Sequence, residues 1–140
     1  MKLAKINTIV GILAGIQFFR ITDKKTRTAL IDDYRNLRPF FKKSNEEAEA
    51  IQSKFQEDWN DELDAIRTLR EKGLPVVGHD AYLDAEKAAN KAIADVFDAE
   101  VEVDIKSVGL DDFLANCAGV ATNLTLEQFA FLEEVGIITE

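Results

Sequence analysis

The chain has 140 residues, of which 46% are hydrophobic and 31% are charged, and its formal net charge is -9 at pH 7. That composition is ordinary for one globular domain, and it argues against a disordered chain or a fibrous repeat. Cys117 and His79 are the only cysteine and histidine. They exclude an internal disulfide and a zinc site made from several such ligands within one chain. We therefore expect a reducing, cytoplasmic location, with no metal and no cofactor.

The N-terminal apolar stretch from Ile6 to Phe19, preceded by two lysines, is the one segment with features of a secretory signal. It is interrupted by polar residues and is shorter than the ~20 residues that a membrane-spanning helix needs. Apolar residues recur in it at helical spacing, which predicts a helix from about Thr8 to Phe19. We expect no membrane partner.

The strongest periodic pattern runs from Asp23 to about Lys72. At 100° per residue its apolar residues project to one side, which predicts a long amphipathic helix. Pro39 lies opposite this side, and Ser44 with Glu47 matches a capping box, so the helix is either bent or broken into a helical hairpin near these residues. The apolar stripe that we predict to be an interaction surface consists of Leu30, Tyr34, Leu37, Phe41, Ile51, Phe55 and Trp59. An unbroken helix of that length would outreach every other helix of the chain, which favours self-association.

The remaining segments predict short elements. Gly73 ends the long helix, and a hairpin-like insert near 73–83 follows. Residues 100–106 alternate between charged and β-branched side chains, which is typical of a strand with one exposed face, and residues 2–6 are its expected antiparallel partner. Three shorter helices complete the chain, and Thr125 with Gln128 caps the last of them.

These elements define the expected fold. We predict an α-rich α+β protein in which a long bent amphipathic helix or helical hairpin combines with shorter helices and a small antiparallel strand pair. We expect residues 1–140 to form a single helical domain that carries the hairpin-like insert.

The order of the pieces resembles a family of small proteins of unknown function from tailed bacteriophages of the siphovirus type. The resemblance spans most of the chain and rests on Met1-Lys2-Leu3, the charged long helix, the insert from Gly73 to Val77, the segment from Glu100 to Ile105 and the closing Leu124 to Gln128. It implies a phage or prophage origin. It transfers no catalytic residue.

Three groups of residues carry the chemistry that an enzyme or metal site would use. His79 beside Asp80 suggests proton transfer, but adjacent residues rarely reach the required geometry. Cys117 has no basic neighbour in sequence that would lower the pKa of its thiol. Asp58, Asp61 and Glu62 share a helix but lack a calcium-loop or Glu-x-x-His pattern. We predict that none of them is catalytic or binds a metal.

Charge is distributed unevenly along the chain. Residues 1–43 contain ten Lys or Arg and three Asp or Glu, whereas residues 44–140 contain seven and twenty-three. Such a contrast marks an anion-binding segment or two parts that neutralise each other, and we favour the second. Five basic residues share one side of the predicted long helix as a candidate anion-binding stripe: Lys24, Arg27, Arg35, Arg38 and Lys42.

The expected function is a non-enzymatic protein-interaction or assembly module, phage-encoded, that forms a homo-oligomer or binds another protein. The alternative is a nucleic-acid-related factor, either a binder through its basic helix or an acidic mimic that inhibits a nucleic-acid-binding protein of the host.

Overall fold

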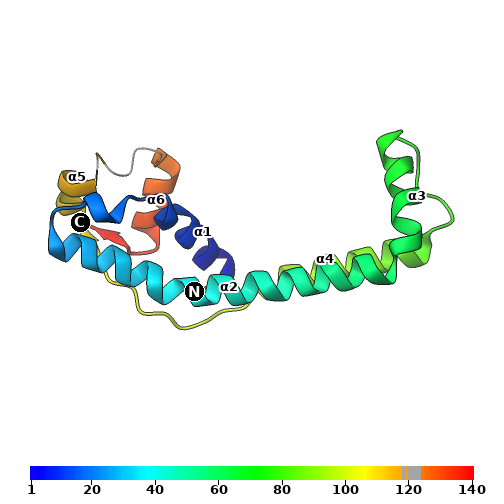
Figure 1. The fold of residues 1–140 in the computed structure, drawn as a ribbon, viewed down its shortest axis with the longest axis horizontal. Coiled ribbons are helices and arrows are strands. Elements are labelled where there is room, and N and C mark those ends of the chain that lie inside the picture. Colours follow the sequence, from blue (N-terminus) through cyan, green and yellow to red (C-terminus); the bar gives the residue numbers. More distant parts are fainter. Residues whose placement is uncertain (118, 120–123) are drawn as a thin grey trace. The chain divides into compact units, whose positions relative to one another are not determined.

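The computed structural model describes residues 1–117, 119 and 124–140, and it is rich in helix (Figure 1). Its elements are α1 (Leu3–Ala14), the 3-10 helix η1 (Phe18–Arg20), α2 (Lys24–Asp58), α3 (Asn60–Glu71), α4 (Asp80–Asp98), β1 (Val108–Gly109), α5 (Leu110–Cys117), α6 (Leu126–Glu134) and β2 (Ile138–Thr139). The predicted α-rich class with one long helix is confirmed. Among the described residues, no helix is both long and apolar enough to cross a membrane.

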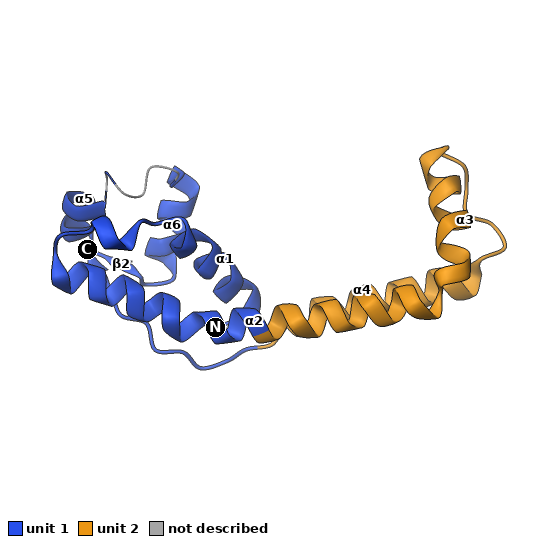
Figure 2. Ribbon diagram, in the orientation of Figure 1, with its two compact units in different colours: residues 1–42, 100–140 blue, residues 43–99 orange. Residues whose placement is uncertain are grey.

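The chain divides into two compact units, shown in different colours in Figure 2. Unit 1 comprises residues 1–42 and 100–140, and unit 2 comprises residues 43–99. The boundary falls inside α2. The single domain expected over residues 1–140 stays a prediction.

Unit 1 is organised around α1. Ile6, Ile9 and Leu13 are fully buried there, together with Leu30 and Leu37 of α2. The helix begins earlier than the predicted Thr8, because Leu3 and Ile6 extend the same apolar side toward the N-terminus. The α-helix ends at Ala14 rather than at the predicted Phe19, and Phe18–Arg20 form the separate turn η1.

The small sheet of unit 1 differs from the prediction. β1 and β2 pair in parallel, with Val108 opposite Ile138 and Gly109 opposite Thr139, so the expected antiparallel strand pair is wrong. Residues 2–6 cannot supply a partner strand because α1 begins at Leu3. One isolated antiparallel bridge joins Lys2 to Glu100. Residues 101–107 form no strand, although their alternation does place Val101, Val103 and Ile105 against the core.

Unit 2 contains the C-terminal part of α2, together with α3 and α4. α2 continues through Pro39, which lies on its exposed side, and ends at Asp58. Trp59 alone separates it from α3. Gly73 has φ 67° and stops α3 as predicted, and the Leu74 N–H donates back to the Leu69 carbonyl oxygen at 2.9 Å.

The core of unit 2 is small. Phe55, Ile66 and Tyr82, one from each helix, are its buried apolar residues. The rings of Phe55 and Tyr82 lie 5.4 Å apart, and Trp59 meets Tyr82 edge-on at 5.8 Å. The first turns of α4 pack against this core, since Ala85 and Ala89 also contact it.

Candidate functional site

Most of the predicted apolar stripe is covered within the chain. In unit 1, Leu30 and Leu37 are fully buried and Tyr34 and Phe41 pack against the same core. In unit 2, Phe55 is buried and Trp59 packs beside it. Ile51 is half-buried and belongs to neither core. The role of the stripe as an interaction surface stays a prediction, and Ile51 is its member best placed for that role.

A second group of apolar side chains lies on α4 and on the C-terminal part of α2, in unit 2. Its side chains are half-buried, and none of them belongs to either buried core. We call this surface the seam and define it as Ala48, Ile51, Ala92, Ile93, Val96 and Phe97. The period of α4 predicts its apolar side from sequence. The hydrophobic pattern of one helix cannot predict whether another helix packs on its apolar side, because that depends on the tertiary fold.

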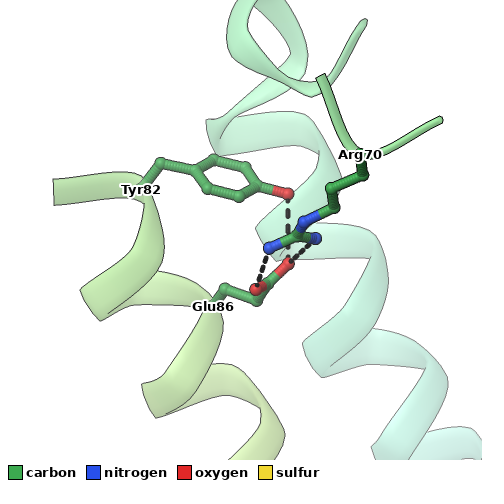
Figure 3. Close-up of polar contacts among 3 residues, drawn as sticks. All are labelled: Arg70, Tyr82 and Glu86. Atoms are coloured by element: carbon green, nitrogen blue, oxygen red, sulfur yellow. Dashed lines mark hydrogen bonds and ion pairs between the residues drawn. The ribbon is translucent and has the colours of Figure 1, made fainter. Parts of the chain in front are cut away.

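Three polar side chains are linked beside the small core of unit 2 (Figure 3). Arg70 of α3 reaches Glu86 of α4 with both terminal nitrogens, at 2.8 and 2.9 Å, and the Tyr82 hydroxyl donates to the same carboxylate at 3.3 Å. The guanidinium holds the pKa of Glu86 below its usual value, while burial raises the pKa of Tyr82. The trio lines a groove of about 430 Å³. Because its charges are already paired, it ties α3 to α4 and leaves no activated acid or base.

His79 contacts Glu62 rather than its neighbour Asp80. Its Nδ1 lies 2.9 Å from Oε2 of Glu62, so the imidazole links the connector before α4 to α3. The pair that sequence reasoning weighed, His79 with Asp80, forms no hydrogen bond within the described residues. In the described part of the chain, no cluster of His, Cys, Asp or Glu has a geometry that would hold a metal ion.

Cys117 is fully buried at the end of α5. Burial raises the pKa of its thiol to about 11, so the thiol stays protonated at neutral pH. A protonated, inaccessible thiol is a poor nucleophile.

The structure brings together only part of the predicted basic stripe. Arg35, Arg38 and Lys42 line one groove of about 340 Å³ with Tyr34 and Pro39. The three cations are exposed, and none forms an ion pair within the described residues. We call this surface the basic groove.

The other two members of the stripe are separate from it. Lys24 is exposed at the beginning of α2, and Arg27 donates from Nη1 to the Ile21 carbonyl oxygen at 3.0 Å. Lys24 lines a larger groove of about 680 Å³, together with Lys25 and Lys106. Asp23 already caps this helix start, because its Oδ2 accepts from both the N–H and the hydroxyl of Thr26, at 2.9 and 2.6 Å. An anion would therefore meet a carboxylate at that point.

Sequence reasoning missed Asp33. Its side chain is fully buried in unit 1, where Oδ1 accepts the Lys106 backbone N–H at 2.7 Å and Oδ2 has no partner within the described residues. Burial raises the pKa of Asp33 to about 6, against the opposing effect of that hydrogen bond. Asp32 pairs with the Lys106 ammonium alongside. The two aspartates hold Lys106 against α2.

Comparisons with protein-family models, with the sequences of characterised proteins and with solved structures returned no match to this chain.

Proposed function

We propose that this chain is a non-enzymatic protein-interaction module that associates with further copies of itself through unit 2, in the cytoplasm of the bacterial host of a tailed phage. The phage origin rests on the resemblance given above. The self-association rests on one observation, the half-buried apolar side chains of the seam.

The seam supports this proposal because its six apolar side chains are only half-buried and belong to neither core, so a partner that covers them would bury further apolar area. Two antiparallel helices form one layer, and a stable domain needs a second layer over the apolar side. Burial of apolar surface contributes roughly 25 cal/mol per Å². A second copy that lays its own seam on the first would give a four-helix arrangement, in which Ile51, Ile93, Val96 and Phe97 become core residues.

The test is the mass of the protein in solution. Light scattering at high ionic strength should give a mass of at least a dimer at micromolar concentration, and Ile93→Glu should give a monomer there, because it buries a charge in the seam. Asn90→Glu adds the same charge on an exposed position of α4 and should leave the mass unchanged. Far-UV circular dichroism should show equal helix content in all three proteins. A parent chain that stays monomeric over the whole concentration range contradicts the proposal.

The absence of a catalytic role is part of the same proposal. It is supported by the occupied geometry of His79 and by the buried thiol of Cys117. His79→Ala should accordingly leave the mass and any measured biological activity of the folded protein unchanged. Loss of such an activity in folded His79→Ala protein would favour an enzyme.

A nucleic-acid-related factor is the second candidate, because the basic groove presents three exposed cations without a partner in the described residues. Salt-sensitive binding of an oligonucleotide that depends on these three cations would favour this candidate over the first.

A further inference from the structure

The basic groove of unit 1 is unusual for this chain because acids outnumber bases overall, 26 to 17. With so many carboxylates present, cations on a folded surface commonly find one nearby. Arg35, Arg38 and Lys42 instead remain exposed on consecutive turns of one helix and are unpaired within the described residues. Three like charges at this spacing repel one another, so a bound anionic surface would relieve that repulsion.

Unit 1 also carries a groove of the opposite charge. Asp111, Asp112 and Glu140 line a groove of about 510 Å³ with Gly109 and Leu110. All three carboxylates are exposed, and none forms an ion pair within the described part of the chain. We call this surface the acidic groove. Its three carboxylates match the three cations of the basic groove in number.

One copy cannot join its own two grooves. The acidic groove adjoins the beginning of α2, because Gly109 and Asp112 also line the groove that contains Lys24 to Thr26. The basic groove is centred near Arg38, about 18 Å further along the helix axis at 1.5 Å per residue. That separation exceeds the reach of an arginine side chain.

We propose that the basic groove of one copy receives the acidic groove of a second copy, so that units 1 associate head to tail. This inference rests on the proposed self-association and adds a second, electrostatic contact to the apolar one at the seam. One copy contributes its basic groove and the other its acidic groove, so the contact is heterologous. A heterologous contact repeats from copy to copy until a ring closes or a filament grows. Assemblies larger than the seam dimer are the consequence.

The experiment uses two charge-reversed variants of the full chain, studied by analytical ultracentrifugation. The first is Arg35→Glu with Arg38→Glu and Lys42→Glu, which makes both grooves acidic. The second is Asp111→Lys with Asp112→Lys and Glu140→Lys, which makes both grooves basic. The parent should form species larger than a dimer at low ionic strength and fewer of them at high ionic strength. Each variant alone should stop at the seam dimer, and an equal mixture of the two should regain the larger species.

Two controls distinguish the loss of the contact from a folding defect. Asp111 and Asp112 lie in the first turn of α5, where negative charge is favourable. A neutral version, Asp111→Asn with Asp112→Asn and Glu140→Gln, should therefore also lose the larger species while circular dichroism stays unchanged. Recovery in the mixture requires folded grooves in both variants.

The outcomes separate the two proposals. A parent that is a seam dimer, equal in mass to both reversed variants, overturns the head-to-tail contact and leaves self-association standing. A monomeric parent overturns both. Binding of a fluorescein-labelled oligonucleotide by the parent, lost at high ionic strength and in folded Arg35→Glu/Arg38→Glu/Lys42→Glu, with no change of mass between them, overturns the contact and assigns the basic groove to phosphates.

Discussion

The two units of this chain bury their apolar residues to very different extents. Among its described residues, unit 1 has sixteen buried ones in one cluster, contributed by α1, α2, α5, α6, the small sheet and the segments that connect them. Unit 2 has three, at one end of a pair of long helices, and its seam stays half-exposed. A core is built by residues that converge from several elements, so helix length alone does not provide one. Unit 1 is therefore expected to be stable by itself, and unit 2 to gain stability from association.

The largest expected effect comes from truncating one isoleucine in each unit. Ile9 is fully buried, so Ile9→Ala should lower the free energy of unfolding by about 2–5 kcal/mol at every protein concentration. Ile93 is half-buried, so Ile93→Ala should cost only about 1 kcal/mol at high dilution. Its cost should grow with protein concentration, since association buries the same side chain. Urea denaturation followed by circular dichroism measures both.

One result would contradict this difference between the two units. Equal, concentration-independent losses for Ile9→Ala and Ile93→Ala would mean that unit 2 is as well packed as unit 1 without a partner. The seam would then lose its role.

How much of this contrast the sequence predicts depends on the range of the interactions. Local patterns were sufficient for the stop at Gly73 and for the capping box at Thr125, where the Gln128 N–H donates to the Thr125 hydroxyl at 3.1 Å and the Gln128 side chain accepts in return. The alternation of residues 100–106 correctly predicts which side faces the core. It cannot predict pairing, because that depends on whether another segment is extended.

Local sequence patterns do not predict the helix break at Trp59 or the polar contacts between distant residues. Apolar periodicity continues across Trp59, since Ile66 stays in phase with Phe55 and is buried in the same core, so no composition signal marks the break. Asp33 bonds to Lys106 across 73 positions, and Arg70 bonds to Glu86 across the connector that follows α3. A charged residue inside an amphipathic pattern does not reveal whether it will be covered. Adjacent aspartates at the edge of an apolar side are a weak signal of such a buried site.

A second prediction concerns the pH dependence of stability that the buried Asp33 gives to unit 1. The pKa of Asp33 is about 6 in the folded chain and 3.8 in the reference state, so the folded state binds the proton more tightly. Stability contributed by the protonated form is therefore fully present below about pH 4 and is lost as pH rises through 6. Over that window the parent should lose about 1–3 kcal/mol that Asp33→Asn does not lose.

Urea titrations at a series of pH values check this prediction, with Glu127→Gln as a control because Glu127 is exposed. The difference between parent and Asp33→Asn should widen from pH 4 to pH 7, and the control should follow the parent. Parallel curves for parent and Asp33→Asn would show that the carboxyl of Asp33 does not titrate in this window.

The smallest expected effect concerns the ion pair of unit 2, where Arg70 and Glu86 are both partly exposed. Solvent screening keeps such a pair weak, and salt weakens it further. Both terminal nitrogens of Arg70 nevertheless bond to the Glu86 carboxylate, which fixes the orientation of the pair. The pair joins α3 to α4 beside the three-residue core. Arg70→Glu should lower the melting temperature slightly at low ionic strength, Glu86→Arg should do the same, and Arg70→Glu/Glu86→Arg should recover part of the loss. All three differences should shrink at high ionic strength.

The cycle isolates the coupling between the two side chains from the separate effect on Tyr82, which loses its acceptor in both variants that lack Glu86. If the double variant is no more stable than the sum of the single losses implies, the pair contributes nothing, and the packing of Phe55, Ile66 and Tyr82 alone holds α3 to α4.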